Sequence, residues 1–230
     1  MKTKITFQKG ELTKFAKAIS KDETREVLTS FGHAHDLFVA TNGRILLGYE
    51  LAGGASRDTY LAADLKGAVS IEAADSATGT LLTVRDKTGT GTTLHPTGST
   101  FPNARQAAPA NEGTPLTFTD MSTLESVLDA VKASTEVVLR VDPEGLGDLR
   151  INNWTDFSSA EFQVVNWIKG GGFAFAINAR FLFDAWKWLI ACGNQLPSWK
   201  MVDGGSPLHH QHAGQVAVIM PMRPEKGGLK

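Results

Sequence analysis

The feature that most constrains the fold is a repeat of helix patterns, spaced by about half of the 230 residues. Apolar residues at positions i, i+3, i+4 and i+7 form one stripe of an amphipathic helix. The first stripe is Leu12, Phe15, Ala16 and Ile19, and the second is Leu124, Val127, Leu128 and Val131. The predicted helices cover 10–20, 61–69, 121–133 and 178–190. Because two helices recur in the same order at nearly the same interval, we infer an internal duplication.

Short β-rich segments bounded by turn residues lie between these helices. In the first half, the predicted strands are Leu37–Ala40, Ile45–Glu50, Leu81–Arg85 and Thr92–His95. In the second half, they are Val137–Val141, Leu149–Asn153, Ser159–Val165, Phe173–Ile177, Lys200–Val202 and Val216–Met220. Asn42-Gly43 predicts a tight hairpin, because both residues tolerate positive φ. Each half therefore follows the order helix, strands, helix, strands, and the fold class is α+β.

A small, polar, proline-containing segment at 107–115 (Ala107–Pro115) is the best candidate for a linker. It divides the chain into domains at 1–109 and 116–224. The tail Pro224–Lys230 is polar and is expected to be frayed.

Composition excludes several classes of protein. Apolar residues make up 42% and charged residues 20%, so the chain can bury a core. The net charge of −1 excludes a protein that coats nucleic acid by bulk charge, although a local basic face stays possible. The single cysteine, Cys192, excludes an internal disulfide framework. The sequence has neither an apolar run long enough to span a bilayer nor a secretory signal, so we expect a soluble, cytoplasmic protein.

Four segments resemble one known family, in that family's order and spacing. They are ETREVLT (Glu23–Thr29), LFVATNGRILL (Leu37–Leu47), TFPNARQAAP (Thr100–Pro109) and a C-terminal stretch that runs from FAINARFLFDAWKWL to VAVIMPMR. The family is the bacterial sliding clamp, the β subunit of DNA polymerase III. The matches fall on its middle and last domains, and its first domain has no counterpart here. Asn42, Ala104 and Phe181 depart from the family's usual Asp, aromatic residue and Tyr.

The resemblance implies two tandem DNA-clamp-type domains, each with two helices packed on antiparallel sheets. It implies a processivity factor that encircles double-stranded DNA without sequence preference and docks DNA polymerase and clamp-loader peptides. The family's ring has six such domains, so three copies of this chain would complete one as a homotrimer. No catalytic residue, metal or cofactor is expected, because a clamp needs no chemistry.

Cations opposite the apolar stripes are the candidate DNA-facing residues. Lys14, Lys17 and Lys21 oppose the stripe of the first helix, and Arg180 and Lys187 oppose that of the last. With the resemblance, the DNA-facing set is Lys14, Lys17, Lys21, Arg25, Arg180 and Lys187. Lysine contacts to phosphate are independent of sequence and permit sliding. Glu125 and Asp129 on the third helix weaken this attraction, and ordinary solvated helix faces are the alternative interpretation.

The partner-peptide pocket is carried over from the family by the same matches. Its predicted residues are Thr41, Gly43, Leu46, Pro109, Val218, Met220, Pro221, Met222 and Arg223. Methionine adapts to different apolar side chains, Pro221 keeps a strand edge open, and Arg223 offers a planar donor fork. The alternative is that Met220 and Met222 only fill a core beside the last strand.

Two other functions compete with a ring-forming clamp. One is a clamp-like adaptor or decoy, of viral or mobile-element origin, that binds clamp-interacting peptides without forming a ring. The other is a small metalloenzyme or hydrolase that uses His209, His210 and His212, or Cys192 as a nucleophile. A polar loop before the last strand is the preferred interpretation of the histidines, and a buried position that of Cys192. Trp186 is expected in the core and Trp188 off it, partly exposed or at an interface.

Overall fold

The computed structural model describes residues 4–52, 57–107, 112–131, 136–144, 146–152, 159–164, 168–169 and 172–222. The N-terminal half contains β1 (Lys4–Thr6), α1 (Glu11–Phe15), η1 (Ala16–Ala18), η2 (Glu23–Thr29), β2 (Phe31–Ala34), β3 (Leu37–Thr41), β4 (Ile45–Glu50), β5 (Arg57–Tyr60), η3 (Ala62–Leu65), β6 (Ser70–Ser76), β7 (Gly79–Arg85), β8 (Gly91–Leu94) and α2 (Ala104–Ala107), where η marks a 3-10 helix. The C-terminal half contains β9 (Thr114–Phe118), α3 (Met121–Ala130), β10 (Glu136–Val141), β11 (Gly147–Asn152), β12 (Ser159–Val164), β13 (Ile168–Lys169), β14 (Phe175–Asn178), α4 (Ala179–Ala191), β15 (Trp199–Met201), β16 (Leu208–His212) and β17 (Gln215–Ile219).

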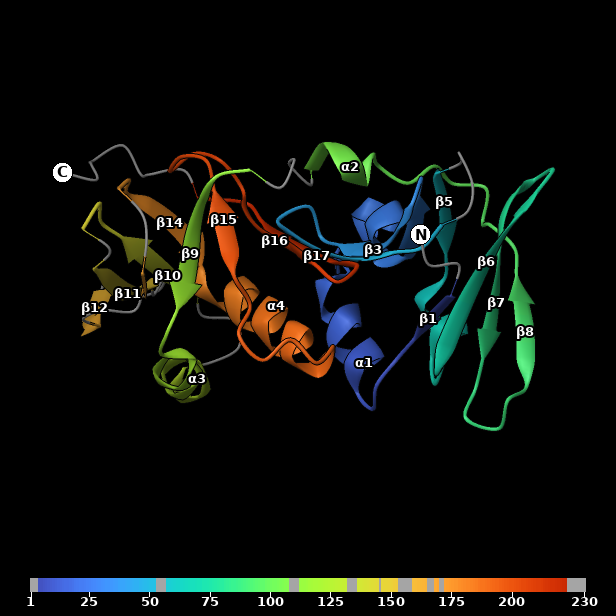
Figure 1. The fold of residues 1–230 in the computed structure, drawn as a ribbon, viewed down its shortest axis with the longest axis horizontal. Coiled ribbons are helices and arrows are strands. Elements are labelled where there is room, and N and C mark those ends of the chain that lie inside the picture. The colour runs from blue at the N-terminus through green and yellow to red at the C-terminus, as the bar shows by residue number, and fades with distance from the viewer. Residues whose placement is uncertain are drawn as a thin grey trace.

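The described strands form three antiparallel sheets. Two four-stranded sheets have the orders β1-β6-β7-β8 and β12-β11-β10-β14. A nine-stranded sheet has the order β13-β9-β15-β16-β17-β4-β3-β2-β5, and so contains strands from both halves. The helices α1, α3 and α4 lie on one side of this long sheet and α2 lies on the other (Figure 1).

The sheet orders reveal the same topology in each half. The order β1-β6-β7-β8 in the N-terminal half corresponds to β9-β15-β16-β17 in the C-terminal half. The order β5-β2-β3-β4 corresponds in the same way to β14-β10-β11-β12. The sequence duplication is therefore visible as a repeated strand order, and the α+β class with helices on antiparallel sheets is confirmed. The proposed domain boundaries remain a prediction, since 108–111 of the linker lies outside the described residues.

The two halves join by continuous strand pairing between β17 and β4. Five residues of β17 pair with β4 in antiparallel register, from Gln215 opposite Tyr49 to Ile219 opposite Ile45. Side chains alternate between the two faces of a strand, so this pairing places one apolar set toward the helices and another toward α2. The cluster on the helix side includes residues from both halves, with α1 packed against α4 beneath the junction.

Aromatic rings fill the junction on the helix side. Phe15 of α1 lies 5.0 Å from Tyr49 of β4 and 5.8 Å from Trp188 of α4, measured between ring centroids. Tyr49 and Trp188 meet nearly edge-on, at 5.2 Å. Edge-on and tilted contacts of this kind add to the free energy gained by burying the rings. The halves are therefore held by a shared core as well as by the strand pairing.

A buried polar cluster crosses the same junction. The Tyr49 hydroxyl donates to Glu11 Oε1 at 2.5 Å and accepts from Trp188 Nε1 at 2.7 Å. The Cys192 thiol donates to the same carboxylate oxygen at 3.2 Å, and the backbone N–H of Gln8 donates to Glu11 Oε2 at 2.5 Å. Burial raises the pKa of Tyr49, so its phenol stays protonated and remains a donor. Because Glu11 and Tyr49 come from one half and Trp188 and Cys192 from the other, the cluster fastens the two together.

Each predicted strand is present, with ends that agree within about two residues where they are described.

Two predicted helices are shorter than expected. The segment 61–69 contains only the 3-10 turn η3, since Gly67 adopts a positive φ of 84° two residues later. The first helix ends in the 3-10 turn η1, because Ile19 is extended and Ser20 donates its N–H to the Leu28 carbonyl at 2.8 Å.

Two other expectations were wrong at least in part. Trp188 is fully buried and not partly exposed, and it lies at the interface between the two halves, which was the other alternative for it; Trp186 is only half-buried against the core. The histidine segment is the strand β16 and not a polar loop, and His209 and His210 are buried in it. The periodicity of a sequence segment predicts that segment's own secondary structure. Which of its side chains are buried here depends on contacts with the other half of the chain.

The polar cluster predicts that removing the Tyr49 hydroxyl lowers the stability of the fold. We expect Tyr49→Phe to lower the free energy of unfolding by about 1–3 kcal/mol, because it leaves both the Glu11 carboxylate and the Trp188 N–H short of a partner. Urea denaturation measures this value. Tyr60→Phe is the matched comparison, since the Tyr60 hydroxyl donates to a single carbonyl, that of Thr80. An equal or smaller loss for Tyr49→Phe would contradict the role given to the cluster.

Candidate functional site

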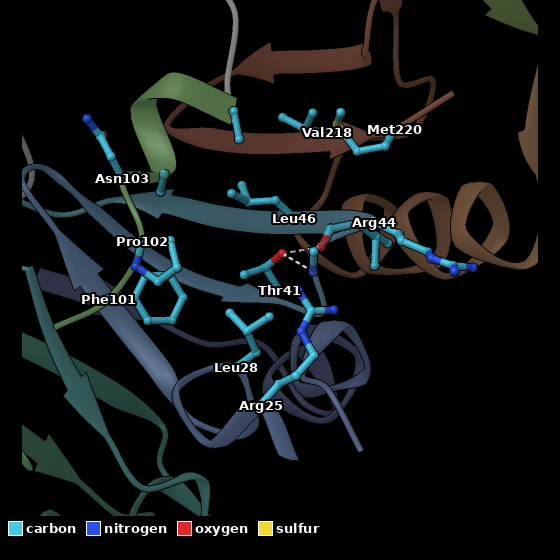
Figure 2. Close-up of a pocket in the computed structure, with 14 residues that line it drawn as sticks. Arg25, Leu28, Thr41, Arg44, Leu46, Phe101, Pro102, Asn103, Val218 and Met220 are labelled. Carbon is cyan, nitrogen blue, oxygen red and sulfur yellow. Dashed lines mark hydrogen bonds between the residues drawn. The ribbon is translucent and has the colours of Figure 1, made fainter. Parts of the chain in front are cut away.

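A cavity of about 210 Å³ opens at the junction, on the face of the long sheet that carries α2 (Figure 2). Its floor is apolar and is shared by the two halves. Leu46 of β4 and Val218 of β17 pair directly across the junction, and Met220 continues the strand at the rim with 42% of its surface exposed. The lining consists of Arg25, Leu28, Thr41, Gly43, Arg44, Ile45, Leu46, Phe101, Pro102, Asn103, Ala104, Ala107, Val218 and Met220. The cavity therefore depends on the β4–β17 pairing.

The β3–β4 turn forms one wall and is fixed by its own hydrogen bonds. Thr41 Oγ1 donates to the Ile45 carbonyl at 2.6 Å and accepts from the Gly43 N–H at 3.0 Å. Asn42 Oδ1 accepts from the N–H groups of Arg44 and Ile45 at 2.9 and 3.1 Å. These bonds explain why an Asn-Gly pair at this position produces a rigid turn.

Arg25 packs against this turn from the segment η2. Its Nη1 donates to the Asn42 carbonyl at 3.2 Å. Gly43 has a φ of +86°, and a Cβ atom there would lie 2.9 Å from Arg25 Nη2. Glycine is thus favoured by the backbone conformation, and a side chain at this position would also displace the Arg25 guanidinium. Among the described residues that line the cavity, Arg25 and Arg44 are the only charged ones; both lie beside the β3–β4 turn, with Arg25 reaching toward the turn and Arg44 extending away from the cavity (Figure 2).

The opposite wall is the segment 101–107, which is anchored at both ends. The Phe101 ring is 1% exposed and lies over Gly32, where a Cβ atom would come within 2.4 Å of it. Arg105 makes a two-pronged ion pair with Asp36, with Nε–Oδ1 at 2.8 Å and Nη2–Oδ2 at 2.5 Å. The hydrogen bonds from Arg105 hold the pKa of the Asp36 carboxyl below its usual value. This wall is therefore preorganised without any occupant.

Five of the nine predicted pocket residues line this cavity: Thr41, Gly43, Leu46, Val218 and Met220. Pro221 and Met222 follow the strand but are not in the lining, and the Met222 N–H donates to the Ala176 carbonyl at 2.8 Å. Pro109 and Arg223 lie outside the described residues. Leu28, Arg44 and Phe101 also line the cavity and were not predicted to do so. All three lie in the segments that resemble the clamp family.

The other predicted set, the cations on the helix side, is only partly brought together. Arg25 is separated from it, since it lies in the cavity. Lys17 Nζ forms an ion pair with Asp184 Oδ1 at 2.9 Å, and Lys187 pairs with Glu125. Lys14 is half-buried beside Phe15, and Lys21 is exposed after η1.

The histidine segment is β16, and His210 of this strand is held by hydrogen bonds within the protein. His210 contacts the Ser198 carbonyl through Nδ1 at 2.6 Å and the Asn194 amide through Nε2 at 2.9 Å. Among the described residues, no group of three or more His, Cys, Asp or Glu side chains is placed to hold a metal ion. Burial raises the pKa of Cys192 above its usual value, so the thiol lacks the thiolate that a nucleophile needs.

Comparison with solved structures places the fold. The DNA polymerase III β subunit from Borrelia burgdorferi, solved in complex with a natural product, has a TM-score of 0.67 and 16% identity, with 96% of this chain and 64% of that chain covered. The β subunit from Thermotoga maritima has a TM-score of 0.65 and 17% identity, with 96% and 66% covered. The β sliding clamp from C. crescentus has a TM-score of 0.65 and 22% identity, with 96% and 65% covered. No protein-family model and no curated protein sequence matches the chain.

These comparisons, together with the repeated sheets, define a protein of the DNA-clamp fold. In particular, the chain has the fold of the bacterial DNA polymerase III β subunit, in a shortened form, as the sequence motifs indicated. It spans slightly less than two thirds of the length of the chains it matches. None of the described helices is long and apolar enough to cross a membrane.

Three buried histidines predict a loss of stability in mild acid. Burial lowers the pKa of His33, His209 and His210 below 6.5 in the folded chain. The unfolded chain therefore binds more protons, and the free energy of unfolding falls as pH drops below about 6.5, by at most about 1.4 kcal/mol per pH unit for each histidine involved.

Urea denaturation between about pH 5.5 and 7.5 measures this slope, because the carboxyl groups titrate at lower pH. His95→Asn, which removes an exposed histidine after β8 and leaves the three buried histidines in place, is the control. Stability that is independent of pH across this window would contradict the prediction.

Proposed function

We propose that this chain is a two-domain sliding clamp that encircles duplex DNA as a homotrimer and tethers replication enzymes through the junction pocket. It acts without catalysis, as a processivity factor. The observation that carries the proposal is the junction between β4 and β17, because the two strands that correspond to them, β12 and β8, are edge strands among the described residues and lie at opposite ends of the molecule.

The repeated topology supports ring assembly. β8 corresponds to β17, and β12 corresponds to β4; among the described strands, each of these two has a neighbour on one side only. They lie at opposite ends of the long axis (Figure 1). Pairing of β8 from one copy with β12 of the next would repeat the internal junction head to tail. Contacts of this type close into a ring when the rotation per copy is right.

The number of copies follows from the resemblance. A clamp ring of six domains needs three copies of a two-domain chain. Sheet edges that pair between copies also protect exposed N–H and C=O groups, which otherwise promote aggregation. The helices α1, α3 and α4 all lie on one side of the long sheet, and in a closed ring they would line the channel (Figure 1).

The junction pocket supports the docking of partner peptides. Its floor is apolar, Met220 at the rim is adaptable, and both walls are rigid before anything binds, which reduces the entropy lost on binding. Arg25 and Arg44 favour a carboxylate in the peptide, next to its apolar side chains. Polymerase and clamp-loader segments that pair a large apolar residue with an acidic one are the occupants that we propose.

A clamp-like adaptor that does not form a ring is the second candidate function. The observation that favours it is the pairing of Lys17 with Asp184 and of Lys187 with Glu125, which reduces the attraction of the helix side for DNA. Such a protein would use the pocket alone.

Assembly and retention on DNA separate these two functions. For the ring, we expect light scattering at tens of micromolar protein to give about three times the chain mass of 24.7 kDa. We also expect protein bound to circular duplex DNA to withstand high salt and to be released when the DNA is linearised. A monomer that binds peptides and is not retained on circles would favour the adaptor.

A substitution at the rim tests the pocket itself. We expect Met220→Ala to weaken binding of a fluorescent polymerase-derived clamp-binding peptide by roughly fivefold or more, because an anchor contact is worth about 1 kcal/mol or more. Leu196→Ala is the matched control, since Leu196 is 72% exposed and is absent from the lining. Fluorescence anisotropy measures both. Equal affinity of Met220→Ala and the original chain would exclude this pocket as the docking site.

A further inference from the structure

The helix side of the junction carries acids and bases in nearly equal number. We define the helix face by the charged residues of α1, η1, α3 and α4 that are not fully buried. Its cations are Lys14, Lys17, Arg180 and Lys187, and its acids are Glu125, Asp129 and Asp184. The net charge of this face is therefore close to zero, although a surface that binds the DNA backbone is usually strongly positive.

One ion pair on this face connects the two halves of the chain. Lys17 of η1 and Asp184 of α4 lie 2.9 Å apart, with side chains 55% and 28% exposed. They are 167 residues apart in the sequence and meet because α1 and α4 pack together beneath the junction. The pair is open to solvent, so a DNA phosphate could compete with Asp184 for the ammonium group.

A second ion pair connects α4 with α3. Lys187 binds Glu125, and their side chains are 36% and 40% exposed. The ammonium group also lies 4.8 Å from the centre of the Phe183 ring. Lys187 is thus held by two groups at once, and contact with a phosphate would require it to leave the carboxylate.

We propose that Asp184 and Glu125 set the DNA affinity of this protein by neutralising the two lysines that would otherwise bind phosphate. The inference rests on the proposed clamp function, since it concerns the face that a ring would turn toward DNA. The two acids give a face that surrounds a duplex and holds it weakly. A face of this kind would favour movement along DNA over tight, salt-sensitive attachment.

The physical basis is the release of counterions from DNA. Each lysine that neutralises a phosphate releases about 0.9 of a condensed cation, which makes binding weaker as salt increases. A lysine that stays paired with its carboxylate neutralises no phosphate and releases no cation. Removing both acids frees two lysines for phosphate and should therefore steepen the plot of log affinity against log salt by up to about 1.8.

The test uses the full chain with the paired substitutions Asp184→Asn and Glu125→Gln. Fluorescence anisotropy with a labelled blunt duplex, from 25 to 200 mM NaCl, gives the affinity and its salt dependence. We expect tighter binding at low salt and the steeper slope. Thermal unfolding checks that the variant is folded, and exposed ion pairs of this kind contribute little to stability.

The matched control is the double variant Glu72→Gln and Asp75→Asn. These two exposed acids lie on β6, away from α3 and α4, and their removal changes the net charge by the same amount. A change that is confined to the Asp184/Glu125 variant supports the proposal, and an equal change in both variants overturns it. If the original chain binds the duplex and both double variants have the same salt dependence as the original chain, only this inference fails. If no variant binds at 25 mM NaCl, this inference fails, and the DNA-encircling function is decided separately by retention on circular DNA.

Discussion

The antiparallel pairing of β17 with β4 is the interaction on which the rest of the structure depends. It extends one sheet through both halves of the chain, and its register decides which side chains face the helices and which face α2. Because side chains alternate along a strand, a shift of one residue would exchange the two sets. The aromatic core lies on one face of the long sheet and the pocket floor on the other, and both depend on the register of β17 with β4.

The polar cluster around Glu11 makes this junction specific as well as stable. Apolar surfaces can slide over one another with little change in free energy, whereas a buried carboxylate with three donors has one satisfactory arrangement. Tyr49 is the centre of the cluster, since it donates to Glu11 and accepts from Trp188. The angle between the halves is therefore defined by hydrogen bonds, and in a ring this angle would fix the curvature.

The sequence predicted local structure in part and contacts between distant segments poorly. Strand alternation, the Asn42-Gly43 turn and three of the four helix patterns are local signals that the structure contains, whereas 61–69 holds only a 3-10 turn and strands such as β1, β6 and β9 were not predicted. The burial of Trp188 and the strand formed by His209 and His210 depend on segments far away in the sequence. The pocket was predicted in part, through Thr41, Leu46 and Val218, because motif resemblance carries long-range information. Arg25, which was predicted to face DNA, lies in the cavity lining beside Gly43, a position that depends on the fold.

The order in which the pocket walls occur along the chain has a consequence for biosynthesis. The β3–β4 turn and the segment 101–107 are separated by roughly a quarter of the chain, and 101–107 and β17 by roughly half, and the floor is complete only when Val218 meets Leu46. A contact of such long sequence separation forms slowly, since the intervening chain must first be ordered. A ribosome carrying a partly made chain would therefore present an N-terminal half with β4 as an open edge. The cell would have to protect that edge from aggregation until synthesis is finished, and no partner could engage the pocket before then.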